Sequence, residues 1–363
     1  MKDLKYWVAF SKILQLGPKR FRLLLSHFPN LEEAWRAPIL ELKKAGLEEK
    51  IVNLIEKRRK EIDPEKEMEI LAKENIKVIP IKAKDYPKLL SEISSPPPLL
   101  YLKGEILSRD EFAIAIVGSR KPTQYGIQVT LEIAKDLALA GLTIISGLAL
   151  GIDTIAHKMA LEANGRTIGV LGGGIDWNSI YPKENKYLIE QILEKGGAIL
   201  SEFPIGTPPL KQNFPFRNRI IAGLSLGTLV IEATETSGAL LTARHAIENS
   251  REVFAIPGSI YSKSSVGPNN LIKMGGKLVT SAQDILEEFN LGSVKKIIKA
   301  REIHPDTKEE KKLLEFISEN PINIDELIKK SGLAPSVVNS TLILMEMKGK
   351  VRNLGGGNYV IGK

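Results

Sequence analysis

Residues 113–120 read Ala-Ile-Ala-Ile-Val-Gly-Ser-Arg, an apolar run that ends directly on a glycine. Similar runs recur downstream, with segments of helical pattern between them. Their apolar residues are continuous rather than alternating, which predicts strands buried on both faces, as in a parallel sheet between layers of helices. The predicted strands are Ala113–Val117, Leu142–Ile145, Thr167–Leu171, Ala198–Leu200, Thr228–Ile231 and Val253–Ile256.

The segments between these runs predict helices, among them Ile127–Ala140, Ile152–Ala163 and Ala239–Glu248. Strands that alternate with helices indicate an α/β fold, here an extended Rossmann-like, doubly wound and mostly parallel sheet. We assign it to residues 85–290. Ligands in such sheets bind outside the carboxyl ends of the strands, so the functional residues are expected there.

Residues 1–84 have a different pattern, because their apolar positions recur at helical spacing. Two turns, at Gly17-Pro18 and Ala45-Gly46, separate the predicted helices. Such turns expose backbone N–H groups that can hold a phosphate, as in SAM or helix-hairpin-helix-like domains. The alternative, which we favour, is a small helical interaction domain. The stretch Ser94-Ser-Pro-Pro-Pro98 predicts a rigid connector before the next region.

The carboxyl-terminal part is predicted to hold a charged linker, residues 291–305, and a winged-helix domain, residues 306–363. Three short helical segments, 312–318, 325–331 and 336–348, precede an expected hairpin over 351–361. The third helix has no arginine and only a terminal lysine, Lys348. Sequence-specific reading of DNA is therefore not expected, and protein contact or a structural role is favoured.

Length and composition narrow the class of protein. A chain of 363 residues is too long for one core and fits two or three domains. Without cysteine it has no disulfide or thiolate metal site, and its four histidines lack a metal-binding spacing. No apolar run is long enough to cross a membrane, and the first residues do not resemble a signal peptide. We expect a cytoplasmic protein without metal or cofactor.

The formal net charge of +8 hints at an anionic partner, although a solvated lysine- and glutamate-rich surface is the alternative. The excess lies in the flanks: residues 111–290 carry 16 basic and 17 acidic side chains. Any anion site in the predicted sheet domain must therefore depend on local clustering.

Several motifs follow directly after predicted strands. Gly118-Ser119-Arg120 combines a close backbone approach, a hydroxyl and a planar guanidinium suited to phosphate. Glycine-bearing turns follow the second and third strands, at 146–153 and 171–176. Ser237-Gly238 precedes a helix whose free N–H groups suit an anion. Together they predict a groove rich in hydrogen-bond donors at one edge of the sheet.

The most specific stretch runs from Pro209 to Ser225, just before a predicted amphipathic helix. Its cations, Lys211, Arg217 and Arg219, are interleaved with the aromatic residues Phe214 and Phe216. Cations that follow a backbone, with rings on which bases stack, are typical of single-strand binding sites, and each stacked base contributes roughly 1–3 kcal/mol. The alternative is that Phe216 is a core residue and the two arginines are structural.

Two nucleotide-binding signatures are absent or incomplete. There is no G-x-x-x-x-G-K-[ST] phosphate-binding loop, and Gly169–Ile175 matches a dinucleotide fingerprint only loosely. No catalytic triad or carboxylate pair stands out, so we do not expect an enzyme. The rival interpretation is a nucleotide phosphoribohydrolase of the "lonely guy" type, because Gly227-Thr228 with Glu232 and Glu235 is distantly similar to its signature.

These motifs, in this order, resemble those of the DNA-processing protein DprA (Smf) family. The matching segments are Gly118–Arg120, Ser146–His157, Tyr181–Lys186, Phe214–Ser225, Ser237–Ala243 and Phe254–Ser259. The resemblance covers residues 85–290 in full and the flanking domains loosely. Leu150 departs from the family, which often has a polar or basic residue there.

The resemblance implies a homodimer that binds single-stranded DNA, protects incoming strands during natural transformation and loads the RecA recombinase for DNA recombination. Carried over by motif, Arg120, Lys183 and Lys211 would contact phosphates and Phe214 would stack a base. Arg217, Asn218 and Arg219 would line or brace the pocket. Gly118, Ser119, Ser237 and Gly238 would donate hydrogen bonds from backbone or hydroxyl groups.

Overall fold

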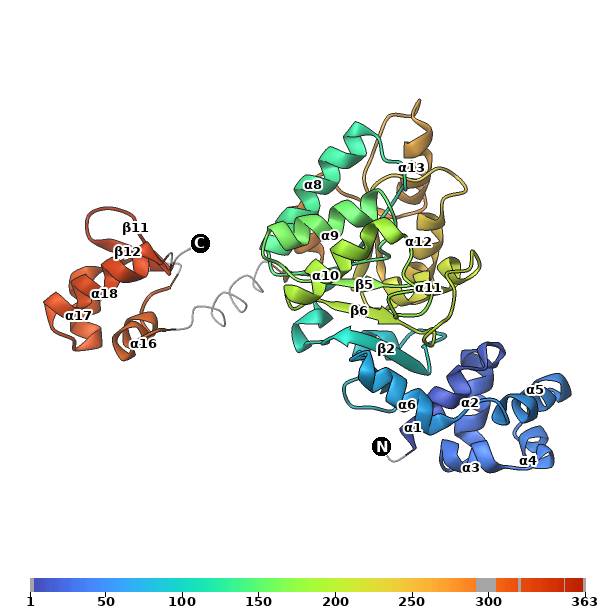
Figure 1. The fold of residues 1–363 in the computed structure, drawn as a ribbon. Helices are drawn as coiled ribbons and strands as arrows, with labels where there is room; N and C mark the ends of the chain where they lie inside the picture. The colour runs from blue at the N-terminus through green and yellow to red at the C-terminus, as the bar shows by residue number, and fades with distance from the viewer. Residues whose placement is uncertain (1–2, 292–304, 319–320, 349, 362–363) are drawn as a thin grey trace. The chain divides into compact units, whose positions relative to one another are not determined.

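The computed structural model describes residues 3–291, 305–318, 321–348 and 350–361, and the chain divides into two compact units, 1–290 and 291–363 (Figure 1). The first unit is built on a nine-stranded sheet with the order β1-β2-β6-β5-β4-β3-β7-β8-β9. Its strands are β1 (Lys77–Pro80), β2 (Leu99–Gly104), β3 (Ala113–Val117), β4 (Thr143–Ser146), β5 (Thr167–Val170), β6 (Ala198–Ser201), β7 (Gly227–Val230), β8 (Glu252–Ala255) and β9 (Lys277–Leu278).

The sheet is mostly parallel, as the sequence predicts. In the spatial order of the sheet, every neighbouring pair from β6 through β5, β4, β3, β7 and β8 to β9 is parallel. The antiparallel pairs are β2 with β6 and β1 with β2. All six predicted strands form, with some ends shifted by one residue. The central strands β3, β4 and β5 are buried along their whole length. Burial on both faces explains their continuous apolar sequence.

Helices cover both faces of this sheet, which confirms the doubly wound fold. They are α7 (Lys88–Ser91), α8 (Gln124–Leu139), α9 (Ile152–Glu162), α10 (Lys186–Glu194), α11 (Asn213–Gly223), α12 (Gly238–Glu248), α13 (Val266–Lys273) and α14 (Ala282–Glu288). α8, α9 and α10 pack against one another in sequence order, and α11 packs against α12 and α7. Residues of α10 such as Ile192 belong to one apolar cluster, which they share with the amino-terminal helices, and residues of α11 such as Ile221 belong to another.

The amino-terminal helices pack into the same unit as the sheet. They are α1 (Leu4–Ser11), α2 (Pro18–His27), α3 (Leu31–Arg36), α4 (Ile39–Lys44), α5 (Glu49–Arg59) and α6 (Pro64–Lys73). Their aromatic core includes Phe10 and Trp35, whose ring centroids lie 4.9 Å apart. The Ser11 and Tyr101 hydroxyls lie 2.6 Å apart and join α1 to β2.

Two features of this region differ from what its sequence pattern indicates. β1 lies within the segment 1–84 that was expected to be helical, and it pairs with β2 as an edge strand of the large sheet. The proline stretch that ends at Pro98 is a loop of the sheet region rather than a connector before it. The Tyr86 hydroxyl donates to the Pro97 carbonyl over 2.8 Å, and the Ile81 amide donates to the Pro98 carbonyl over 3.0 Å.

The second unit has the predicted winged-helix arrangement. Its elements are α16 (Lys308–Leu314), α17 (Ile324–Ser331), α18 (Pro335–Met347), β10 (Ile322–Asn323), β11 (Val351–Asn353) and β12 (Asn358–Ile361), with the strand order β10-β12-β11. Leu313, Leu327 and Leu342 form its core. The predicted linker, 291–305, lies outside the described residues except for its two ends.

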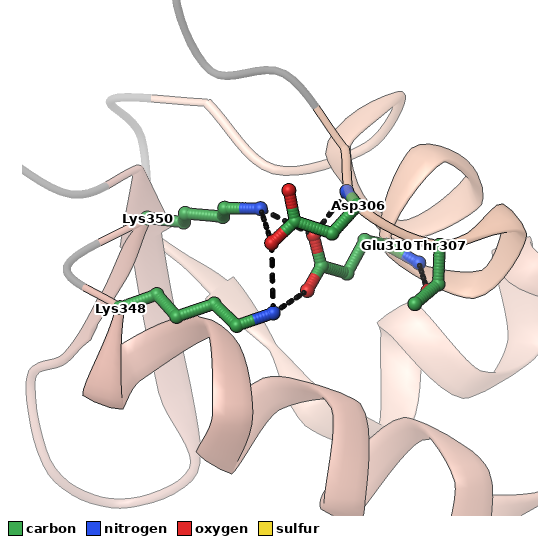
Figure 2. A network of polar contacts seen from close by, with 5 residues as sticks. All are labelled: Asp306, Thr307, Glu310, Lys348 and Lys350. Carbon is green, nitrogen blue, oxygen red and sulfur yellow. Dashed lines mark hydrogen bonds and ion pairs between the residues drawn. The ribbon is translucent and has the colours of Figure 1, made fainter.

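An ion-pair network ties the ends of this unit's elements together (Figure 2). The Lys348 ammonium lies 2.8 Å from Asp306 and 3.0 Å from Glu310, and Lys350 lies 2.8 Å and 2.6 Å from the same two carboxylates. The lysine of the third helix, Lys348, is thus held by two carboxylates.

Candidate nucleic-acid interface

A pocket of about 870 Å³ opens at the carboxyl edge of the parallel strands. Its walls come from the segment after β3, the turn between β4 and α9, the loop and first turn of α11, and the segment between β7 and α12. Nine of the predicted site residues line it: Gly118, Ser119, Arg120, Lys211, Phe214, Arg217, Asn218, Ser237 and Gly238. Parallel topology brings these segments together, because it places all their strand ends at one edge.

Charge is concentrated in this pocket although the domain is nearly neutral. The lining includes four cations, Arg120, Lys121, Lys211 and Arg217, against one carboxylate, Asp153. Arg120, Lys121 and Lys211 are exposed, whereas Arg217 and Asp153 are buried. The exposed cations are accessible to an anionic ligand. Arg217 and Asp153, which are buried, form the bottom of the pocket.

Phe214 forms an aromatic platform between the cations. The Arg120 and Arg217 guanidinium carbons lie 5.7 Å and 5.9 Å from the centroid of its ring. The Tyr181 ring lies 5.9 Å from it at an interplanar angle of 54°. Gly172 supports the ring, since a Cβ on that residue would lie 2.8 Å from a ring carbon. The ring is therefore held in one place, as a stacking surface must be.

Arg217 braces the pocket from below. Its guanidinium donates to the Gly147 carbonyl over 2.7 Å and to the Val170 carbonyl, which joins the ends of β4 and β5. Asp153 accepts hydrogen bonds from the amides of Gly147 and Ala149 in the same turn. Burial lowers the pKa of Arg217 to about 10, against the opposing charge of Asp153, and raises the pKa of Asp153. Arg217 thus stays charged at neutral pH.

The far wall is the start of α12. Ser237 caps this helix, with its hydroxyl accepting from the Ala239 amide over 3.3 Å. The Asn218 side-chain amide donates to the Gly238 carbonyl over 3.1 Å and fixes α11 against α12. Backbone N–H groups at a helix start favour an anion, and Gly238 and Ala239 of this helix line the same pocket as the cations.

Two predicted residues are not brought into the pocket. Arg219 is buried and forms a bidentate ion pair with Glu202, at 3.0 Å and 2.5 Å, and does not line the pocket. This ion pair agrees with the alternative that Arg219 is a structural residue, and its part in lining or bracing the pocket stays a prediction. Lys183 is exposed in a short 3-10 helix (Lys183–Asn185) and does not line the pocket, although Tyr181 does.

The aromatic stretch also differs from its prediction. Phe214 and Phe216 do not precede a helix but lie in the first turn of α11. Phe216 is 57% exposed, so the alternative that places it in the core is wrong. The Arg219 guanidinium carbon lies 5.6 Å from the centroid of its ring. Phe216 therefore covers the Arg219–Glu202 ion pair rather than the pocket.

Several lining residues were not among the predicted contacts, and among them Lys121, Tyr181 and Thr234 carry a polar group. Lys121 follows Arg120, Tyr181 opens a matching motif, and Thr234 follows β7. Two sequence features could have identified the first two residues as contacts. Lys121 doubles the cation Arg120, and Tyr181 is an aromatic residue two positions before Lys183. Thr234 offered none, because threonine is common in strands and turns alike.

Glu232, a glutamate that the hydrolase alternative would need for catalysis, has a structural role instead. Glu232 is 2% exposed, and its carboxylate accepts from the Thr123 amide, the Thr123 hydroxyl and the Ser264 hydroxyl at 2.9, 2.6 and 2.9 Å. It does not line the pocket. Among the described residues no cluster of three or more potential metal ligands occurs, and no described helix is long and apolar enough to span a membrane.

Comparison with known proteins gives matches to both units. The sequence model of the DNA recombination-mediator protein A family matches residues 77–290, and that of the DprA winged helix domain matches residues 299–357. Protein Smf of Synechocystis sp. is 37% identical, with 98% of each chain covered. DNA processing protein DprA of Bacillus subtilis is 46% identical over 60% of this chain and 72% of its own.

Two solved structures resemble the first unit's fold. DNA processing protein A of Streptococcus pneumoniae gives a TM-score of 0.66 at 38% identity, covering 78% of this chain and 96% of that one. DNA processing protein A of Helicobacter pylori gives 0.52 at 31% identity, covering 59% and 95%. The latter structure is described in terms of its single-stranded DNA binding mode.

Proposed function

The chain belongs to the DNA recombination-mediator protein A (DprA, Smf) family, and from this premise we propose that its sheet domain binds single-stranded DNA in the pocket lined by Arg120 and Phe214. The observation that carries the proposal is the pairing of these two side chains. A guanidinium suited to a phosphate lies 5.7 Å from the centroid of a ring on which a base can stack. Neither group reads the hydrogen-bonding edge of a base, so binding without strong sequence preference follows.

The surroundings of this pair support a single strand over a duplex. Phe214 is partly buried, so a base must leave a base pair to reach its face. Lys121 and Lys211 stand at the rim where a flexible backbone can pass. We include Lys183 as a contact outside the pocket, because it is exposed two residues beyond Tyr181.

The remaining parts of the proposal rest on family membership. We propose that the protein protects incoming strands in natural transformation, loads the RecA recombinase onto them, and acts in the cytoplasm as a homodimer. The description of the matching family as recombination mediators supports the RecA step. RecA's strand-dependent ATP hydrolysis, with and without the protein, tests loading, and light scattering tests the dimer.

A salt titration tests the binding proposal. Fluorescence anisotropy of single- and double-stranded oligonucleotides of matched length would give affinity at each salt concentration. We expect tighter binding of the single strand throughout, with a logarithmic salt slope that reflects the few cations at the rim. Lys135→Ala, which removes an exposed cation from α8 outside the pocket, is the control. Equal binding of the duplex at every salt concentration would contradict the proposal.

A further inference from the structure

The loop after β8 presents two apolar side chains to solvent. Ile260 is 80% exposed and Tyr261 is 92% exposed. β8 runs parallel to β7, and β7 runs parallel to β3, so this loop leaves the sheet at the same edge as the pocket. The proposed pocket does not use the loop, since none of residues 258–265 lines it.

Hydrogen bonds hold the loop in a defined conformation. Tyr261 is therefore exposed on an ordered turn. Gly258 and the Asn269 side chain exchange two hydrogen bonds, at 3.2 Å and 3.0 Å. The Ser262 amide donates to the Ser259 carbonyl over 3.0 Å, which closes the turn that carries Tyr261. A ring presented on such a turn loses little conformational freedom when a flat partner stacks on it.

The same loop is joined to the pocket wall on two sides. The Ser264 carbonyl accepts from the Ala233 amide over 2.7 Å, and the next residue, Thr234, lines the pocket. Glu232 accepts from the Ser264 hydroxyl and from Thr123, which follows the Arg120-Lys121 pair by two residues. The Tyr125 hydroxyl donates to the Pro257 carbonyl over 2.8 Å, at the start of the loop.

We propose that a single strand leaving the pocket passes over Lys121 and stacks a base on Tyr261, so that the loop 258–265 is a second contact surface for the same DNA. This inference rests on the proposed function. The charge of the surroundings favours a nucleic acid over an apolar protein partner, because exposed Lys121 and Lys263 stand on the two segments that Glu232 joins. Exposed cations together with an exposed aromatic ring are the composition of a single-strand track.

The test compares single strands of increasing length. Wild-type protein should gain affinity once the strand is long enough to reach the loop. Tyr261→Ala should lose about tenfold on long strands, the effect of one stacked base, and bind the shortest strands as wild type does. Tyr261→Phe should keep the full affinity, because the ring remains. Leu139→Ala, which trims an exposed apolar side chain at the opposite end of α8, is the matched control.

A second readout locates the contact directly. A long strand containing 5-iodouracil should, on irradiation, form an adduct that mass spectrometry maps to the peptide carrying Tyr261, whereas a short strand should not. If Tyr261→Ala binds all lengths as wild type does while Arg120→Ala weakens them, the second surface is refuted and the proposed function stands. If Arg120→Ala also has no effect, the proposed function itself fails. A change in oligomeric state without a change in affinity would make the loop a self-association surface and overturn the inference.

Discussion

Glu232 accepts hydrogen bonds from both the amide and the hydroxyl of Thr123, at 2.9 Å and 2.6 Å, across 109 residues of sequence. The contact joins the segment after β7 to Thr123, the last residue before α8, and so fixes one end of the segment from β3 to α8 that carries Arg120 and Lys121. Gly126 makes room for it, because a Cβ there would lie 2.4 Å from the carboxylate. A buried carboxylate with three donors is thus the anchor of the pocket's cationic wall.

This arrangement predicts that Glu232→Gln is destabilising. The glutamine amide would present a donor to groups that themselves donate, so the free energy of unfolding should fall by roughly 1–3 kcal/mol. Chemical denaturation measures the change. Exposed Glu235→Gln is the control and should stay within about 0.5 kcal/mol of wild type. Neither protein should release free base from nucleoside monophosphates, and release that depends on Glu232 would revive the hydrolase alternative.

Removal of either rim cation should weaken DNA binding. Arg120→Ala and Lys211→Ala should each cost roughly 1–3 kcal/mol of single-strand affinity, the range for a charged hydrogen bond. Each should also reduce the salt slope by about one, because one fewer phosphate is neutralised. Anisotropy titrations at several salt concentrations measure both, beside Lys135→Ala. Unchanged affinity and slope in both variants would exclude these residues from the site.

Gly172→Ala should act through Phe214. The added Cβ would lie 2.8 Å from the ring and displace it from its position near Arg120. We expect a loss of single-strand affinity of no more than roughly 1–3 kcal/mol, the range for one stacked base. In a double-mutant cycle with Phe214→Ala, the glycine substitution should cause no further loss. Additive losses would show that Gly172 serves the DNA in some other way.

Acid should destabilise the winged-helix unit through the network in Figure 2. Hydrogen bonds from Lys348 and Lys350 lower the pKa of Asp306 from 3.8 to about 2. Burial opposes ionisation of Glu310, yet bonds from Lys350, the Asp306 amide and Lys348 keep its pKa below 4.5. Carboxylates with lowered pKa values stabilise the fold above their unfolded values, and this stability is lost as pH falls through the folded values.

The expected result is a loss of winged-helix stability as pH falls from about 4.5 toward 2. NMR titration of the two carboxyl groups in the full chain, with thermal unfolding at each pH, measures it. Asp306→Asn should flatten the dependence. If the unfolding temperature of this unit is unchanged across that range, the ion pairs do not contribute to its stability.

Deletion of residues 305–363 should leave single-strand binding largely intact. The pocket lies wholly within the first unit, and Lys348, the cation at the end of the third helix of the second unit, is paired with Asp306 and Glu310. Anisotropy titrations of the truncated and full-length proteins make the comparison. A loss comparable to that of Arg120→Ala would assign DNA contacts to the winged helix.

The sequence by itself determined six of the nine strands of the large sheet, their parallel direction and the edge at which the functional residues gather. Continuous apolar runs such as Ala113–Val117 require burial on both faces, and a parallel sheet brings all its carboxyl ends to one side. The sequence therefore predicts that Arg120, Lys211 and Phe214 lie at one pocket, and the structure brings them together there.

The tertiary structure alone decided which neighbouring side chains share that pocket. Arg217 and Arg219 look equivalent in sequence, but α11 begins at Asn213, and residues two apart on a helix point about 200° apart. Arg217 therefore faces the strand ends, and Arg219 faces Glu202 on the opposite side. The link from Glu232 to Thr123 and Ser264 likewise depends on β7 lying between β3 and β8, a strand order that local sequence pattern does not encode.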